Sequence, residues 1–128
     1  MNLFTKAQFE QLLANGRNRD QDHPPVVKLF TPDAGCTWLL SEIDPEEPDI
    51  AFGLCDLGLR FPELGCVSLD ELRSLRGKLG LPVERDLSFT AGHPMSVYAE
   101  AARWTECITE DRPALLQAAA TLAARRSK

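Results

Sequence analysis

The feature that most constrains the fold of this chain is the short, turn-forming connections between its apolar runs. A run at 26–31 is rich in β-forming residues, and Pro32-Asp33-Ala34-Gly35 separates it from the next run at 36–43. Proline and glycine at these places are typical of a tight turn. A parallel pair of strands needs a crossover of about a dozen residues or more. The short connection therefore predicts that these two strands pair antiparallel.

The third apolar run, at 50–57, is apolar on both faces, which is typical of a central strand covered on each side. It follows a short connection at 44–49, so we expect it to pair antiparallel with the strand before it. Gly53 has no side chain to pack and indicates a bulge or the close approach of another backbone. A short run at 63–67 is the next expected strand. The charged segment 82–89 is expected to add an edge strand.

Helices are expected on either side of these strands. Thr5 and Gln8 have the spacing of a capping box at the start of a helix over 5–15, and Ser68 and Glu71 have the same spacing before a helix over 68–76. We expect a glycine at 77 or 80 to end the second helix. Apolar periodicity predicts a third helix over 96–104, and an alanine-rich helix follows at 113–126.

These elements predict an α+β fold, an antiparallel β-meander of about four to five strands flanked by helices, with an appended C-terminal helix. The length of 128 residues suits one domain, which we place at 1–108, with the alanine-rich helix at 109–128. The side chains expected in the core are Leu12, Val27, Leu29, Trp38, Leu40, Phe52, Leu54, Val67, Leu72 and Trp104.

Composition narrows the class of protein. The chain is 44% hydrophobic and 26% charged, which is ordinary for a globular protein. No apolar run approaches the roughly 20 residues of a membrane-spanning helix, and the N-terminus lacks the apolar core of a signal peptide. We therefore expect a cytoplasmic protein without membrane contact. The net charge of −5 argues against direct binding to nucleic acid, which needs a basic surface.

No residue pattern predicts catalysis or a cofactor. The four cysteines form no Cys-x-x-Cys pair, and His23 and His93 have no partner at metal-ligand spacing, so we expect free cysteines, no metal and no cofactor. Gly53, Gly58 and Gly65 lack the spacing of a phosphate-binding loop. A nucleophile elbow of the Gly-x-Ser-x-Gly type is also missing. We therefore expect no turnover.

The acidic connection at 44–49 concentrates negative charge in a short loop. Its carboxylates, on Asp44, Glu46, Glu47 and Asp49, predict a binding surface for a protein partner with a basic surface. Two prolines restrict the loop and reduce the entropy lost on binding. A solvated hairpin tip is the alternative interpretation, and a cation site is a third.

The chain resembles a bacterial family of small proteins that share a domain of unknown function. The resemblance rests on four runs, Val-Val-Lys-Leu-Phe-Thr-Pro (26–32), Thr-Trp-Leu-Leu-Ser-Glu (37–42), Asp-Ile-Ala-Phe-Gly-Leu-Cys-Asp-Leu-Gly (49–58) and Pro-Glu-Leu-Gly-x-Val-Ser-Leu (62–69). It covers roughly residues 1–104. The resemblance implies that the protein is carried on plasmids and integrative conjugative elements, and it supplies no catalytic residues.

Three functions remain open at this point. We expect a non-catalytic protein-binding accessory protein of a mobile genetic element, with inhibition of a host defence complex as one such role. A second hypothesis is a small enzyme that acts on nucleotides or nucleic acid through Asp33, Asp56 and Asp86. Finding these three carboxylates together in one pocket would favour it. A third is a nucleic-acid-binding accessory factor that uses basic residues at 17, 19, 28 or 125–126. The oligomeric state is open.

Overall fold

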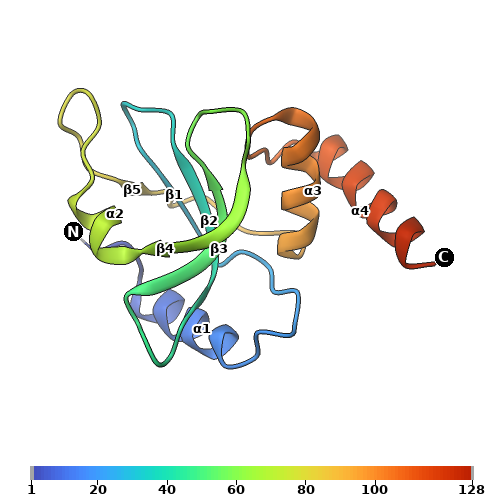
Figure 1. Cartoon of the computed structure of the whole chain (residues 1–128), viewed down its shortest axis with the longest axis horizontal. Coiled ribbons are helices and arrows are strands. Elements are labelled where there is room, and N and C mark those ends of the chain that lie inside the picture. Colours follow the sequence, from blue (N-terminus) through green and yellow to red (C-terminus); the bar gives the residue numbers. More distant parts are fainter. Residues whose placement is uncertain (1, 128) are drawn as a thin grey trace.

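A five-stranded antiparallel sheet forms the centre of the computed structural model, which describes residues 2–127 (Figure 1). The strands run in the order β4-β3-β2-β1-β5, and every neighbouring pair is antiparallel. Their bounds are Val27–Phe30 (β1), Thr37–Ile43 (β2), Ile50–Asp56 (β3), Glu63–Ser68 (β4) and Glu84–Arg85 (β5). The expected α+β fold with its meander is confirmed, and the segment 82–89 supplies only a two-residue edge strand.

The helices lie on both sides of the sheet. They are Lys6–Gly16 (α1), Leu69–Ser74 (α2), Met95–Thr105 (α3) and Arg112–Arg126 (α4). In Figure 1, α1 packs against β2 below the sheet, α3 covers part of the opposite face, and α4 packs against α3. None of the described helices is long and apolar enough to cross a membrane.

Alternation along β2 divides the core into two parts. Trp38 and Leu40 belong to the cluster that packs under α1 with Leu12, whereas Leu39 belongs to the cluster under α3. Leu39 and Leu40 are both fully buried. Burying a leucine side chain stabilises a fold by about 1.5–3 kcal/mol. A strand buried on both faces therefore anchors both layers of the protein.

Gly53 marks a close approach of two backbones, as expected from its place in the third apolar run. A Cβ atom built at this position would lie 1.9 Å from the carbonyl oxygen of Leu39. The pairing of β2 with β3 shifts by one residue between Leu40 and Glu42, next to this contact. The extra residue of the bulge bends β2, and only a residue without a side chain fits beside it.

Capping boxes were expected at the starts of α1 and α2, and only the one at α1 forms completely. Thr5 and Gln8 form both hydrogen bonds of the expected capping box. Ser68 Oγ accepts from the Glu71 amide at 3.3 Å, but Glu71 makes no return bond to Ser68 among the described residues. Asp49 completes the cap instead, because its carboxylate accepts from Ser68 Oγ at 2.7 Å and from the Asp70 amide at 2.8 Å.

The expected end of α2 was wrong. The helix ends at Ser74 rather than at Gly77 or Gly80, and Leu75 is already extended. The carboxylate of Asp33 accepts from the amides of Leu79 and Leu81, which holds the following loop against the turn between β1 and β2. These two hydrogen bonds join residues far apart in the sequence, so the local pattern of glycines did not predict where the helix stops.

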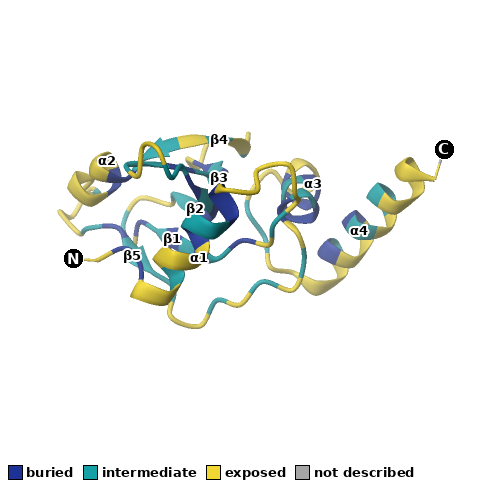
Figure 2. Cartoon of the chain, turned by 90° about the horizontal axis from the view of Figure 1, so that it is seen from below, coloured by how far each residue is buried: buried dark blue, intermediate teal, exposed yellow. Residues whose placement is uncertain are grey.

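The expected core needs three corrections. Trp104 is 45% exposed, because α3 turns Val97, Tyr98 and Ala101 toward the protein and places Trp104 at its open last turn. Phe52 is only partly buried, because α3 does not reach the part of the sheet where β3 and β4 pair. Val67 packs on the other face, against the cluster that contains Leu69 and Leu72, and it is only partly buried because β4 is the outer strand of the sheet. Figure 2 shows the resulting mixture of intermediate and exposed residues along β4.

The C-terminal helix lies against α3. Leu115 and Ala118 are buried in the same cluster as Tyr98, and Arg125 forms an ion pair with the buried Glu100 at 2.6 Å. Asp111 caps the helix by accepting from the amide of Ala114. The division of the chain into a domain at 1–108 and a helix at 109–128 stays a prediction.

Candidate functional site

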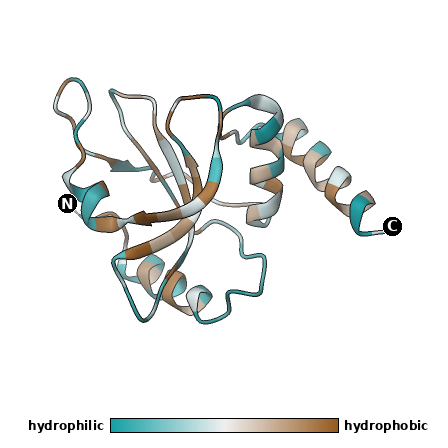
Figure 3. Cartoon of the chain, viewed as in Figure 1, coloured by the Kyte–Doolittle hydropathy of each residue, from teal (hydrophilic) through white to brown (hydrophobic). Residues whose placement is uncertain are grey.

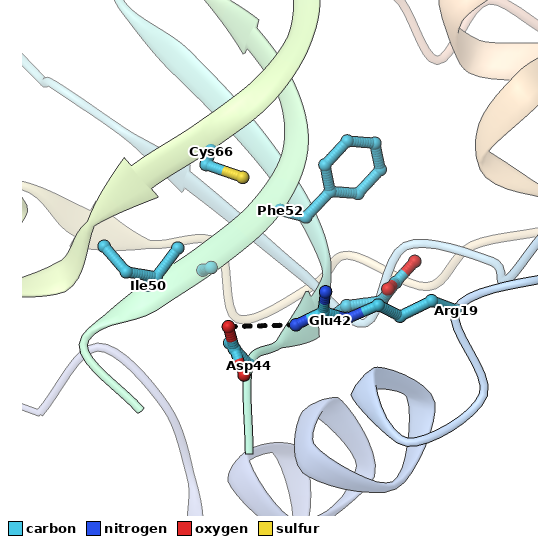
Figure 4. Close-up of a pocket in the computed structure, with 7 residues that line it drawn as sticks. Arg19, Glu42, Asp44, Ile50, Phe52 and Cys66 are labelled. Carbon is cyan, nitrogen blue, oxygen red and sulfur yellow. Dashed lines mark ion pairs between the residues drawn. The ribbon is translucent and has the colours of Figure 1, made fainter. Parts of the chain in front are cut away.

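A pocket of about 250 Å³ opens beside the paired strands β3 and β4 (Figure 4). Phe52 and Cys66 lie opposite each other in the pairing of β3 with β4, and both line the pocket. The full lining is Arg19, Glu42, Asp44, Ile50, Ala51, Phe52 and Cys66. The apolar part of this surface comes from the part of the sheet that α3 leaves uncovered.

Charged groups form one rim of the pocket. In Figure 4 the guanidinium of Arg19 reaches from the loop after α1 to Asp44, and their atoms Nη2 and Oδ2 are 2.9 Å apart. Partial burial raises the pKa of Glu42 above its usual value of 4.5, and the positive charges of His23 and Arg19 only partly offset this effect. The pocket thus places an apolar surface beside one ion pair and one desolvated carboxyl group.

The acidic connection at 44–49 lies next to this rim and has a well-organised backbone. The Glu46 amide donates to Asp44 Oδ1 at 2.9 Å, and the Ile50 amide donates to the Glu47 carbonyl at 2.9 Å. The bond from the Glu46 amide lowers the pKa of Asp44, with a further contribution from Arg19. The connection also lies against α1, because a Cβ at Gly16 would lie 3.2 Å from Cδ of Pro45. The loop is therefore held in one shape.

The structure divides the four carboxylates expected to bind a partner into two pairs. Asp44 is occupied by Arg19 and by the loop backbone, and Asp49 is occupied by Ser68 and the start of α2. These contacts lower the pKa of Asp49, with the hydroxyl of Ser68 as the largest cause. Glu46 and Glu47 are exposed. Two carboxylates thus shape the loop, and two face solvent.

The three aspartates of the enzyme hypothesis each contact a different part of the chain. Asp33 holds the loop at 79–81, Asp56 accepts from the amides of Gly58 and Ile108, and Asp86 pairs with Lys28 at 3.6 Å. Such contacts explain these residues as structural groups. Within residues 2–127, no three His, Cys, Asp or Glu side chains lie close enough together to hold a metal ion.

Most of the basic residues that could bind nucleic acid form ion pairs with carboxylates. Arg19 contacts Asp44, and Lys28 contacts Glu110 at 2.5 Å. Arg125 contacts Glu100, and Arg126 lies 3.7 Å from Asp22. Carboxylates therefore offset part of the positive charge of these four residues, which weakens their attraction to a phosphate backbone.

The cysteines differ in their surroundings. All four are free thiols; Cys66 and Cys107 are exposed, whereas Cys36 and Cys55 are half-buried. Burial raises the pKa of the Cys55 thiol to about 11, with a smaller contribution from nearby Cys66. Cys55 is therefore protonated at neutral pH and unreactive as a nucleophile.

Sequence reasoning missed the pocket itself. Phe52 was expected in the core, and Cys66 was expected to be one of several free cysteines. A signal was nevertheless present, because the apolar runs that become β3 and β4 offer more apolar residues than α3 and α1 together cover. Where a helix stops over a sheet is a tertiary property and is not encoded in the spacing of one strand.

A family model described as "Protein of unknown function (DUF2958)" matches residues 3–109. The chain belongs to this family. The match spans all five strands and the first three helices, so the pocket and the acidic connection lie within the DUF2958 region, whereas α4 lies beyond it. A search of curated proteins and a search of solved structures found no match. The expected resemblance to a domain of unknown function is confirmed.

Proposed function

We propose that this DUF2958 protein is a non-catalytic accessory protein that binds another protein through the acidic connection and the adjoining pocket. One observation carries the proposal: the exposed carboxylates of Glu46 and Glu47 lie next to a pocket with an apolar lining. The loop that bears them is held by its own hydrogen bonds. A loop of fixed shape loses little entropy when it binds. The pocket of about 250 Å³ suits one inserted side chain, since pockets for small molecules typically span about 300–1,000 Å³.

The partner in this proposal has a basic surface. Exposed carboxylates attract such a surface at long range and speed the encounter. Proteins that hold nucleic acid have basic surfaces, and clustered carboxylates compete for the same surface by resembling phosphates. A nucleic-acid-binding host defence complex is therefore the proposed partner. The proposal also places the protein in the cytoplasm and its gene on a mobile genetic element. The plasmid setting comes from the family resemblance.

The test begins with the immobilised full-length protein, which captures partners from a bacterial lysate for identification by mass spectrometry. Association of a purified partner is then measured with the double variant Glu46→Lys/Glu47→Lys. The control, Glu10→Lys/Glu106→Lys, changes the net charge equally at exposed sites on α1 and after α3. Both pairs are measured at ionic strengths of about 0.02 M and about 0.5 M, where the Debye length falls from roughly 20 Å to roughly 4 Å.

We expect the loop variant to associate at least about tenfold more slowly than the control at low salt, and the difference to shrink at high salt. Unfolding curves of both variants should match that of the unmodified protein. Equal rates for the loop variant and the control at both salt concentrations would remove the acidic connection from the binding mechanism.

A further inference from the structure

The outer strand β4 leaves one backbone edge open. It pairs with β3 through an unbroken register from Ile50↔Ser68 to Cys55↔Glu63, and it is the last strand of the sheet. Figure 2 shows it at the margin of the sheet. Edge strands are usually protected by lysine, proline or a bulge. The six residues of β4 contain none of these, and Glu63 at its start is the single charged residue among them.

The pairing identifies which backbone groups face the open edge. The Leu69 amide donates to the Asp49 carbonyl at 2.7 Å, so this pair, in continuation of the β3–β4 register, is hydrogen-bonded. Hydrogen-bonded and non-hydrogen-bonded pairs alternate along antiparallel strands. The amides of Glu63, Gly65 and Val67 therefore point toward β3. Those of Leu64 and Cys66 point outward, where a further strand would bind them.

Gly65 lies in the middle of this edge, and no contact within residues 2–127 requires a glycine there. A Cβ at this position would have no atom within 4 Å, and the residue does not have a positive φ. Its partner Gly53 differs in this respect, because a Cβ there would strike the backbone of β2. A glycine inside a strand often marks a site where another backbone approaches closely. At Gly65, this backbone would belong to another molecule.

Apolar side chains surround the open edge. Leu57, Leu59 and Phe61 are exposed in the turn before β4, and Leu64 is 47% exposed within the strand; Phe61 is 79% exposed. Figure 3 shows hydrophobic residues along β3 and β4. Exposed apolar side chains gathered in one place are typical of an interaction surface.

Acidic residues lie at both ends of β4. Glu63 is exposed at its start, and Asp70 and Glu71 are exposed just beyond its end. Arg73 offsets part of this charge through its contact with Asp70 at 3.3 Å. In an antiparallel pair of two copies, Glu63 of one copy would face Asp70 and Glu71 of the other, and like charges opposite each other are destabilising. The charges therefore disfavour a second copy and favour a strand with basic ends.

We propose that β4 accepts an extended segment of the partner protein as a sixth strand, with an apolar middle and Lys or Arg at both ends. The inference rests on the proposed function and specifies its binding mode. Main-chain hydrogen bonds to Leu64 and Cys66 would supply affinity, and alternate side chains of the added strand would contact the apolar surface beside Phe52. Basic ends would meet Glu63 at one end and Asp70 and Glu71 at the other.

The probe is a synthetic nine-residue peptide with alternating valine and threonine in its middle and two basic residues at each end. Its control has acidic residues at the ends. Binding to the full-length protein is followed by NMR, together with the exchange rate of each amide proton in β4. The variant Cys66→Pro removes an outward amide, a change that edge strands tolerate. Cys66→Val keeps this amide and is the matched control.

The expected result is at least about tenfold tighter binding of the basic peptide and at least about tenfold slower exchange at Leu64 and Cys66. Cys66→Pro should lose most of the binding and Cys66→Val should keep it. The exchange data need no variant, so a Cys66→Pro protein that fails to fold leaves the test intact.

Several results would overturn the inference: no binding of the basic peptide, equal binding of both peptides, or binding without slower exchange at Leu64 and Cys66. A dimer joined through β4 in sedimentation would replace the partner strand with a second copy. None of these outcomes decides the proposed function, because the lysine variants of the acidic connection test that function with the captured partner.

Discussion

Replacing Gly53 with alanine places a methyl group against the backbone of β2. The new Cβ would lie 1.9 Å from the Leu39 carbonyl oxygen and 2.8 Å from the Leu40 Cα. Real Cβ atoms essentially never approach closer than 3.0 Å, so the two strands must separate by about 1.1 Å at this point. Both atoms belong to the backbone of fully buried residues of β2, so no side-chain rotation relieves the contact.

The expected cost of Gly53→Ala is about 3 kcal/mol, the upper end of the range for overpacked sites. With a urea m-value of about 1.5 kcal/mol/M, the unfolding midpoint should fall by about 2 M. The matched control is Gly65→Ala on the neighbouring strand, directly opposite. There the methyl group enters open space, so the variant should match the unmodified protein or gain up to about 1 kcal/mol.

Urea unfolding of both variants, followed by circular dichroism, measures the difference. The reasoning is refuted if Gly53→Ala unfolds within about 0.5 kcal/mol of the unmodified protein, because the close approach of β2 and β3 would then be absent. A loss of several kcal/mol for Gly65→Ala would equally show that this side of β4 is packed rather than open.

Three further predictions concern the helix cap, the desolvated carboxyl group and the thiols. Ser68→Ala should destabilise the protein by about 0.5–2 kcal/mol in urea unfolding, because it removes the acceptor for the Glu71 amide and the donor to Asp49; an unchanged midpoint would contradict the cap. The raised pKa of Glu42 means that folding favours the protonated carboxyl group, so stability should decline as the pH rises from about 4.5. Glu42→Gln should flatten this decline in thermal unfolding, and an identical pH profile would show that Glu42 is fully solvated. Cys66 and Cys107 should react quickly with Ellman's reagent at pH 7 and Cys55 slowly, since burial keeps the Cys55 thiol protonated; rapid modification of Cys55, located by mass spectrometry, would contradict this environment.

Local patterns predicted the elements well where the deciding contacts are close in sequence. The length of the connections determined the antiparallel pairing, and Thr5 and Gln8 are only three residues apart in their capping box. Gly53 was also informative, because the absence of a side chain in an apolar strand has few explanations other than a bulge or a close backbone.

Predictions failed where residues far apart in the sequence decide the outcome. The carboxylate of Asp49 caps α2 from 19 and 21 residues away, and Asp33 holds a loop 46 and 48 residues further on. Trp104 fits the apolar pattern of α3, but the path of the helix across the sheet exposes it. The spacing of residues within one element does not contain this information.

The candidate site follows the same rule. The sequence predicted the acidic loop, yet it did not predict that Asp44 and Asp49 are used inside the protein while Glu46 and Glu47 stay exposed. The pocket depends on how far α3 extends over the sheet, and the open edge of β4 depends on the order of the strands. These features arise only when the elements pack together.

Hydrogen exchange measured by mass spectrometry on the full-length protein, with and without its captured partner, tests the central claim most directly. The account predicts slower exchange in the complex over the acidic connection at 44–49 and over β4, with little change in α1 and α4. Slower exchange confined to α4 or to the outer side of α1, with 44–49 and 63–68 unchanged, would contradict it.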